Sequence, residues 1–141
     1  MIDELTYAEG MLKRGGYTLV ICSGGRVQFS EEKGIRPLLE LADSGEDWSG
    51  AYAADKIVGK AAAMLYAHLK VKAVFAEVLS ESAKDVFEKY GVEYRYDTLT
   101  ENIINRKGTG LCPMEEAVQS TDSPNDALAA IRNKLIELKS R

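Results

Sequence analysis

Residue types that bind metals are scarce in this sequence. Its 141 residues include one histidine, His68, and two cysteines, Cys22 and Cys112. A zinc site usually takes about four ligands, with short spacings between pairs of them. These three residues are far apart in the chain, in a predicted helix, strand and loop respectively. We therefore do not expect a metal site, and we predict no cofactor.

A basic excess and a long hydrophobic run are also missing. Eighteen lysines and arginines against 22 acidic residues give a formal net charge of −4, which disfavours binding to long nucleic acid. No apolar run approaches the ~20 residues of a membrane span, and the opening MIDELTYAEGMLKR is too polar for a signal peptide. We expect a cytoplasmic protein that binds no membrane and keeps its cysteines as thiols.

What the sequence does contain is typical of one globular domain. Hydrophobic residues make up 45% of it and charged residues 28%, an ordinary soluble composition. The length also suits a single domain, and no repeat, linker or low-complexity segment interrupts it. We predict one domain over residues 1–141.

The pattern of apolar residues predicts alternating helices and strands. A hairpin at 17–29, with its turn at Gly24-Gly25, precedes units of strand and helix. This order predicts an α/β protein whose mixed sheet begins with the hairpin and has helices on both sides. Helices are predicted over 2–14, 37–44, 56–70, 82–90, 98–107, 114–119 and from Pro124 onward, and further strands over 50–54, 71–79 and 92–96.

The first candidate cluster lies at the predicted start of the alanine-rich helix, with Asp55, Lys56 and Lys60. Free amides at a helix N-terminus favour an anionic group. Because Lys60 follows Lys56 by one turn, both ammonium groups can face a phosphate. Asp55 would accept a hydrogen bond from a ribose hydroxyl or act as base or nucleophile; the alternative is that it only caps the helix.

A second cluster follows the strand at 71–79, where Ser80 and Ser82 begin the next helix. In open α/β sheets, ligands bind beyond the carboxyl ends of the strands. Ser82 and Asp85 resemble a capping box. Capping explains one of the two serines, and we expect both to donate hydrogen bonds to a ligand.

The third cluster is the segment GTGLCPMEE. Gly108, Thr109 and Gly110 form a loop whose backbone can approach a ligand closely. Cys112 precedes a proline suited to the first position of a helix, where the dipole lowers a thiol pKa and makes it a better nucleophile. Two acidic residues nearby oppose that effect, and a buried, inert Cys112 is the alternative. Asn102, Asn105 and Arg106 are candidate polar contacts.

Three segments together resemble one family. GIRPLLELA, DKIVGKAAAML and above all GTGLCPMEE look like a small prokaryotic family called domain of unknown function eighteen-ninety-three. The resemblance runs from about Leu19 to the last helix. It implies a cytidine deaminase-like fold, a three-layer α/β/α sandwich. The family has no settled activity.

The resemblance does not bring the zinc chemistry of deaminases with it. Zinc deaminases have H-x-E at the start of one helix and P-C-x-x-C at the start of the next. The corresponding starts fall here near Asp55 and near Ser80, and neither offers a histidine or cysteine. Without such ligands no water is activated by a metal.

These observations favour a zinc-free, deaminase-like domain that binds a nucleotide or related small anionic ligand near Asp55 and Ser80. If it is an enzyme, its activity is metal-independent, with Asp55 and Cys112 as catalytic residues. The alternative is a non-catalytic sensor or interaction module with a degenerate deaminase site. In that case exposed aromatic residues, Trp48, Tyr94 and Tyr96, would contact a partner or a second copy of the chain.

Overall fold

The computed structural model describes residues 3–105 and 107–139. Its centre is a five-stranded mixed sheet with strand order β2-β1-β3-β4-β5. The first strand pairs antiparallel with both of its neighbours, whereas the last three strands are parallel to one another. The strands are β1 (Leu19–Ser23), β2 (Arg26–Ser30), β3 (Tyr52–Val58), β4 (Ala73–Ser80) and β5 (Glu93–Thr100).

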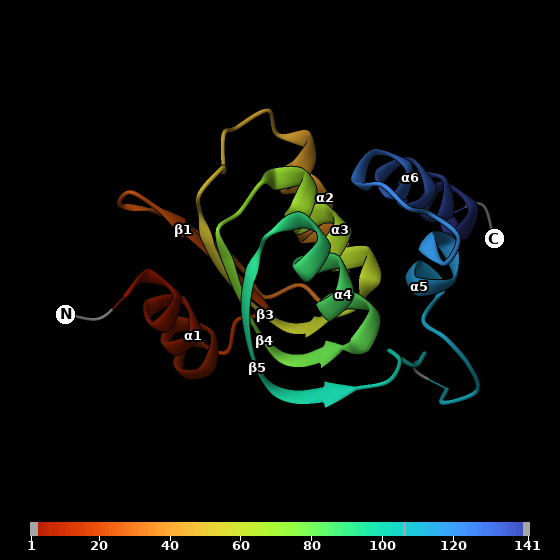
Figure 1. The fold of residues 1–141 in the computed structure, drawn as a ribbon, viewed down its shortest axis with the longest axis horizontal. Coiled ribbons are helices and arrows are strands. Elements are labelled where there is room, and N and C mark those ends of the chain that lie inside the picture. Colours follow the sequence, from red (N-terminus) through yellow and green to blue (C-terminus); the bar gives the residue numbers. More distant parts are fainter. Residues whose placement is uncertain (1–2, 106, 140–141) are drawn as a thin grey trace.

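Helices cover both faces of this sheet, as the order of elements predicted. One helix, α1 (Glu4–Gly15), packs alone on one face, and α2 (Arg36–Asp43), α3 (Lys60–Leu69) and α4 (Glu81–Tyr90) lie on the other. The last two helices, α5 (Pro113–Val118) and α6 (Pro124–Lys139), pack against the outside of α3, so α1 and α6 lie at opposite ends of the molecule (Figure 1). None of the helices in the described ranges is long and apolar enough to cross a membrane.

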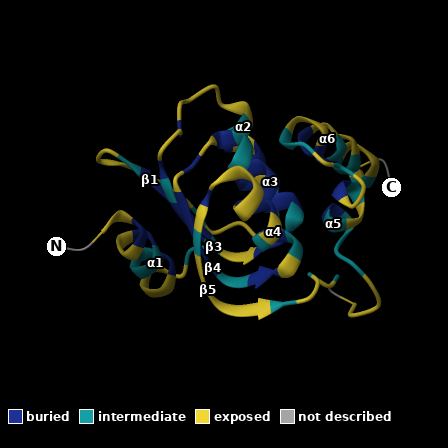
Figure 2. Ribbon diagram, viewed as in Figure 1, coloured by how far each residue is buried: buried dark blue, intermediate teal, exposed yellow. Residues whose placement is uncertain are grey.

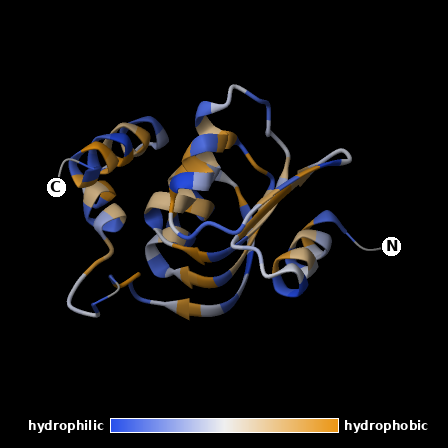
Figure 3. Cartoon of the chain, turned by 180° about the vertical axis from the view of Figure 1, so that it is seen from behind, coloured by the Kyte–Doolittle hydropathy of each residue, from blue (hydrophilic) through white to orange (hydrophobic). Residues whose placement is uncertain are grey.

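Two hydrophobic clusters hold the layers together, one on each face of the sheet. Alternate side chains of β1 divide between them: Val20 packs toward α1, and Ile21 packs toward α2 and α3. The larger cluster surrounds α3, which is buried on most of its surface and lies between the sheet and α6 (Figure 2). The view from behind shows apolar bands on the strands and on the side of α1 that faces them (Figure 3).

Several local predictions are confirmed because their signals are local. Gly24 and Gly25 turn the hairpin with φ angles of 54° and 90°, and Gly91 ends α4 with φ of 72°. Ser123 caps α6: its hydroxyl accepts a hydrogen bond of 3.2 Å from the amide of Asp126.

The predicted boundary between the third strand and the alanine-rich helix is wrong. The prediction ended the strand at Ala54 and began the helix near Lys56, but β3 continues to Val58 and α3 begins at Lys60. Ile57 and Val58 are β-branched residues, which favour strands, and both pair with β4. Asp55 is therefore a strand residue and not a helix cap.

The helix predicted over 98–107 is also wrong. β5 continues to Thr100, because it pairs with β4 along its whole length, and the last pair is Thr100 with Ser80. Beyond β5 the chain folds back on itself: the Cys112 amide bonds to the Ile103 carbonyl, and the Asn105 amide bonds to the Gly110 carbonyl. Arg106 lies outside the described residues.

Two further expectations are corrected. Ser80, and not Ser82, caps α4, since its hydroxyl accepts from the Ala83 amide at 3.1 Å. Trp48 is 1% exposed and belongs to the larger core cluster, so it does not offer a surface to a partner. The guanidinium group of Arg26 lies 4.1 Å from the centre of its ring.

Candidate functional site

A pocket of about 470 Å³ lies at the carboxyl end of β3. Its walls come from five separate parts of the chain: the start of β1, the segment leading into α2, the end of β3 with the start of α3, the loop after β5, and the start of α5. Most of the lining is aliphatic. The apolar residues are Leu19, Ile35, Leu38, Ile57, Ala61, Ala62, Ile103, Ile104 and Met114, and the polar ones include Lys33, Asp55, Lys56, Cys112 and Glu115.

The carboxyl group of Asp55 is held in the wall of this pocket by Tyr66. Asp55 points to the α3 side of the sheet, and Tyr66 of α3 is fully buried behind it. The Tyr66 hydroxyl donates a hydrogen bond of 2.7 Å to Oδ2 of Asp55. The pair fixes the orientation of a carboxyl group that a ligand in the pocket would meet.

The surroundings of Asp55 favour its neutral form. Burial among apolar side chains raises the pKa of Asp55 to about 7, although hydrogen bonds from the Tyr66 hydroxyl and from the backbone of Ile57 and Lys56 act to lower it. Burial, with the charge of Asp55, also raises the pKa of Tyr66 well above its usual value. A carboxyl group with a pKa near neutrality can both accept and release protons at physiological pH.

The N-terminus of α3 already holds an anion, and it comes from the chain itself. The two carboxylate oxygens of Glu115 accept hydrogen bonds from the amides of Lys60 and Ala61 at 2.7 and 3.0 Å. Gly59 permits this approach, because a Cβ there would lie 2.3 Å from Oε1 of Glu115. The amides predicted to face a ligand's phosphate are therefore used to tether α5 to α3.

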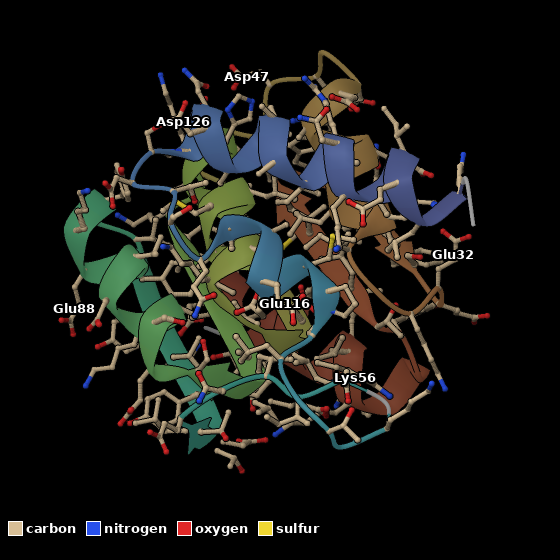
Figure 4. The ribbon with its side chains drawn as sticks, turned by 90° about the vertical axis from the view of Figure 1, so that its right-hand side faces the viewer. Glu32, Asp47, Lys56, Glu88, Glu116 and Asp126 are labelled. Atoms are coloured by element: carbon tan, nitrogen blue, oxygen red, sulfur yellow. The ribbon has the colours of Figure 1, made fainter. Side chains whose placement is uncertain are left out.

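The pocket brings together some of the residues that the sequence singled out. Asp55, Lys56 and Cys112 line it, although they come from β3 and from the start of α5. Lys56 lies beside the loop that joins β5 to α5 (Figure 4). The sequence predictions for Asp55 and Cys112 thus concern one and the same site.

Other candidates are not part of this pocket. Lys60 is directed to α5, where its ammonium group donates to the Gln119 carbonyl at 3.2 Å. The hydroxyls of Ser80 and Ser82 lie 3.2 Å apart, so the second serine is the partner of the first. Gly108, Thr109 and Gly110 form the exposed tip of the loop after β5 and do not line the pocket. Thr109 bonds within that loop to Asn105.

The residues at the two helix starts do not fit the zinc of deaminases. The start of α3 is Gly59-Lys60-Ala61, without an imidazole or thiol, and its amides hold Glu115. At the start of α4, the buried hydroxyl of Ser80 is used as a cap. In the described ranges, no three histidine, cysteine or acidic side chains come together in a group that could hold a metal ion.

Sequence reasoning missed Tyr66, Glu115 and Lys33. Tyr66 reads as one more apolar residue of a buried helix, and nothing local indicates that its hydroxyl meets Asp55. The sequence indicates Glu115 only as a charge that opposes a reactive Cys112, because the two amides that it contacts lie 55 and 54 positions away. Only a long-range contact gives either residue its role.

Comparison with known proteins places the chain in a family. No curated protein sequence matches it. The chain is similar to the structure of a DUF1893 family protein from Thermotoga maritima, at 27% sequence identity and a TM-score of 0.86, over 95% of this chain and 92% of that one. Residues 7–135 match the family described as Domain of unknown function (DUF1893). The chain therefore belongs to the DUF1893 family.

Proposed function

We propose that this chain binds a small nucleotide-like molecule in the pocket beside β3. The observation that carries the proposal is the Asp55–Tyr66 pair, a positioned carboxyl group in the wall of an otherwise largely apolar cavity. Sites for small organic ligands have this composition: apolar walls with a few fixed polar groups, and volumes of roughly 300–1,000 Å³. The pocket, at about 470 Å³, is large enough for one nucleoside.

We further propose that the domain has the cytidine deaminase-like architecture, a sandwich of α1, the sheet and the layer of α2, α3 and α4. The support is the antiparallel hairpin at one edge, followed by parallel strands with a helix after each of β3 and β4. The pocket lies at the carboxyl end of β3, one of the parallel strands, and open α/β sheets bind ligands beyond the carboxyl ends of their strands.

If the domain is catalytic, the chemistry proceeds without a metal and rests on two side chains. Asp55 is the group suited to proton transfer, since the pKa of its carboxyl is raised to about 7 by burial. Cys112 supplies a thiol in the same pocket. The sequence placed a ligand's phosphate at the N-terminus of α3, but Glu115 accepts hydrogen bonds from the amides there. A phosphate of the ligand must therefore bind to cations at another place.

Thermal unfolding in the presence of nucleosides, nucleotides, NAD and ADP-ribose tests this proposal. We expect at least one of these to raise the melting temperature of the wild-type protein. The shift should shrink in Lys56→Ala, which removes an exposed cation from the pocket, and persist in Lys72→Ala, which removes an exposed lysine outside it.

Binding that survives in Lys56→Ala and in Asp55→Asn would place the ligand elsewhere. A complete absence of shifts would overturn the proposal and favour the non-catalytic interaction module.

A further inference from the structure

We infer that the ligand enters this pocket with its base first, donates an N–H hydrogen bond to Asp55, and leaves its phosphate or ribose outside near Lys33 and Lys56. This inference rests on the proposed function and adds an orientation and a recognition rule to it. It follows from the distribution of acceptors, apolar surface and charge around the pocket.

The first step concerns the hydrogen-bonding capacity of Asp55. Burial raises the pKa of Asp55 to about 7, so above this pH its carboxyl group is ionised. An ionised carboxylate has about four acceptor positions and no donor. Tyr66 takes one of them, and the backbone of Ile57 and Lys56 also faces the carboxyl group. What remains toward the cavity is an acceptor position, which a ligand can satisfy only with an N–H or O–H donor.

The second step concerns the walls next to Asp55. Leu19, Leu38 and Ala62 are buried and Ile103 is half-buried, and all four line the same cavity. An aliphatic wall stabilises a flat, uncharged ring through apolar contact and gives nothing to a phosphate or a sugar. A nucleobase combines such a ring with N–H donors on its edge.

The third step concerns charge. Glu115 occupies the amides of α3, and above about pH 7 Asp55 is ionised as well, so the part of the pocket next to these two carboxyl groups repels an anion. The lysines that line the pocket, Lys33 and Lys56, are both exposed. Figure 4 shows Lys56 next to the loop after β5. An anionic group is therefore most stable at the mouth, and the base is directed inward.

Calorimetric titration with matched nucleosides at pH 8, where Asp55 is ionised, tests the recognition rule. The probes are adenosine, cytidine and guanosine, each paired with the same nucleoside lacking its exocyclic amino group. We expect at least one amino nucleoside to bind at least about tenfold more tightly than its partner, because the partner leaves the acceptor of Asp55 unsatisfied. In Asp55→Asn this ratio should fall to within about threefold, since an amide can turn a donor toward the ligand. Asp122→Asn, an exposed site outside the pocket, is the matched control.

The 5′-monophosphates test the orientation. We expect a monophosphate to bind more tightly than its nucleoside, and the combined change Lys33→Ala with Lys56→Ala to remove that advantage while leaving the amino-group ratio unchanged.

Two failures would be distinct. Nucleosides that bind equally well with and without the amino group, or a phosphate advantage that survives loss of both lysines, would overturn this inference and leave the proposed function standing. No binding by any of these probes would overturn both.

Discussion

The Tyr66 hydroxyl donates a hydrogen bond of 2.7 Å to the carboxyl group of Asp55, across the interface between α3 and the sheet. A carboxyl group in apolar surroundings is costly to ionise, and one hydroxyl does not offset that cost. Ionisation of Asp55 therefore lowers the stability of the folded protein. Such sites are more common where a group binds or reacts than where it only supports the fold.

The stability of the protein should fall as the pH rises from about 4 to about 7. The pKa of Asp55 is raised from 3.8 to about 7 by burial, so in this range the folded state holds a proton that the unfolded state has lost. The loss contributed by this residue should reach up to about 4 kcal/mol. In Asp55→Asn this part of the pH dependence should disappear, and the variant should be more stable than the wild type at pH 8.

Urea unfolding at several pH values measures this effect, with Asp122→Asn as the control that keeps the wild-type slope. Parallel pH profiles for the wild type and Asp55→Asn would show that Asp55 ionises normally.

The contact between Glu115 and α3 should contribute to stability as a helix cap. Glu115→Ala removes the acceptors for two amides, and we expect the free energy of unfolding to fall by about 1–2 kcal/mol. Glu116, labelled in Figure 4, is the exposed neighbour of Glu115. Glu116→Ala should change the free energy of unfolding by less than about 0.5 kcal/mol. Chemical denaturation of both variants compares them directly, and equal losses would show that the tether does not stabilise the fold.

Gly59 should be required only while Glu115 is present. The φ angle of Gly59 is −100°, so alanine fits the backbone, but its Cβ would meet the Glu115 carboxylate. Gly59→Ala should therefore destabilise the wild type by about 1–3 kcal/mol and have little effect in a Glu115→Ala background. A double-mutant cycle measures this coupling. Additive losses would mean that alanine is harmful for a reason other than the contact with Glu115.

The two cysteines should differ in reactivity. Cys112 is half-buried and lines the pocket, whereas Cys22 is buried beneath α1 and burial raises the pKa of its thiol to about 11. Mild alkylation of the folded protein should modify Cys112 first, and Cys112→Ser should leave almost no fast-reacting thiol. Mass spectrometry of the modified peptides identifies the site. A bound nucleotide should slow the reaction, and preferential labelling of Cys22 would contradict the structure.

Local signals in the sequence predicted much of the fold. Paired glycines between two apolar runs predict a tight hairpin wherever they occur, and Ser123-Pro124 predicts a helix start, because backbone geometry alone enforces both. The predictions failed at 55–58 and at 98–100, where the strands continue beyond their predicted ends through segments that contain both polar and β-branched residues. The β-branched residues there favour a strand, but pairing with β4, a separate segment of the chain, decides where each strand ends.

By itself, the sequence determined the order of elements and the mixed sheet, and it indicated Asp55 and Cys112 as candidate site residues. The tertiary structure alone decided that these two residues line one pocket, that Tyr66 orients Asp55, and that Glu115 takes the amides predicted for a ligand's phosphate. The physical reason is the range of the interactions involved. Turns and caps act over a few residues, whereas desolvation and a carboxylate–amide contact depend on which distant segments fold against each other.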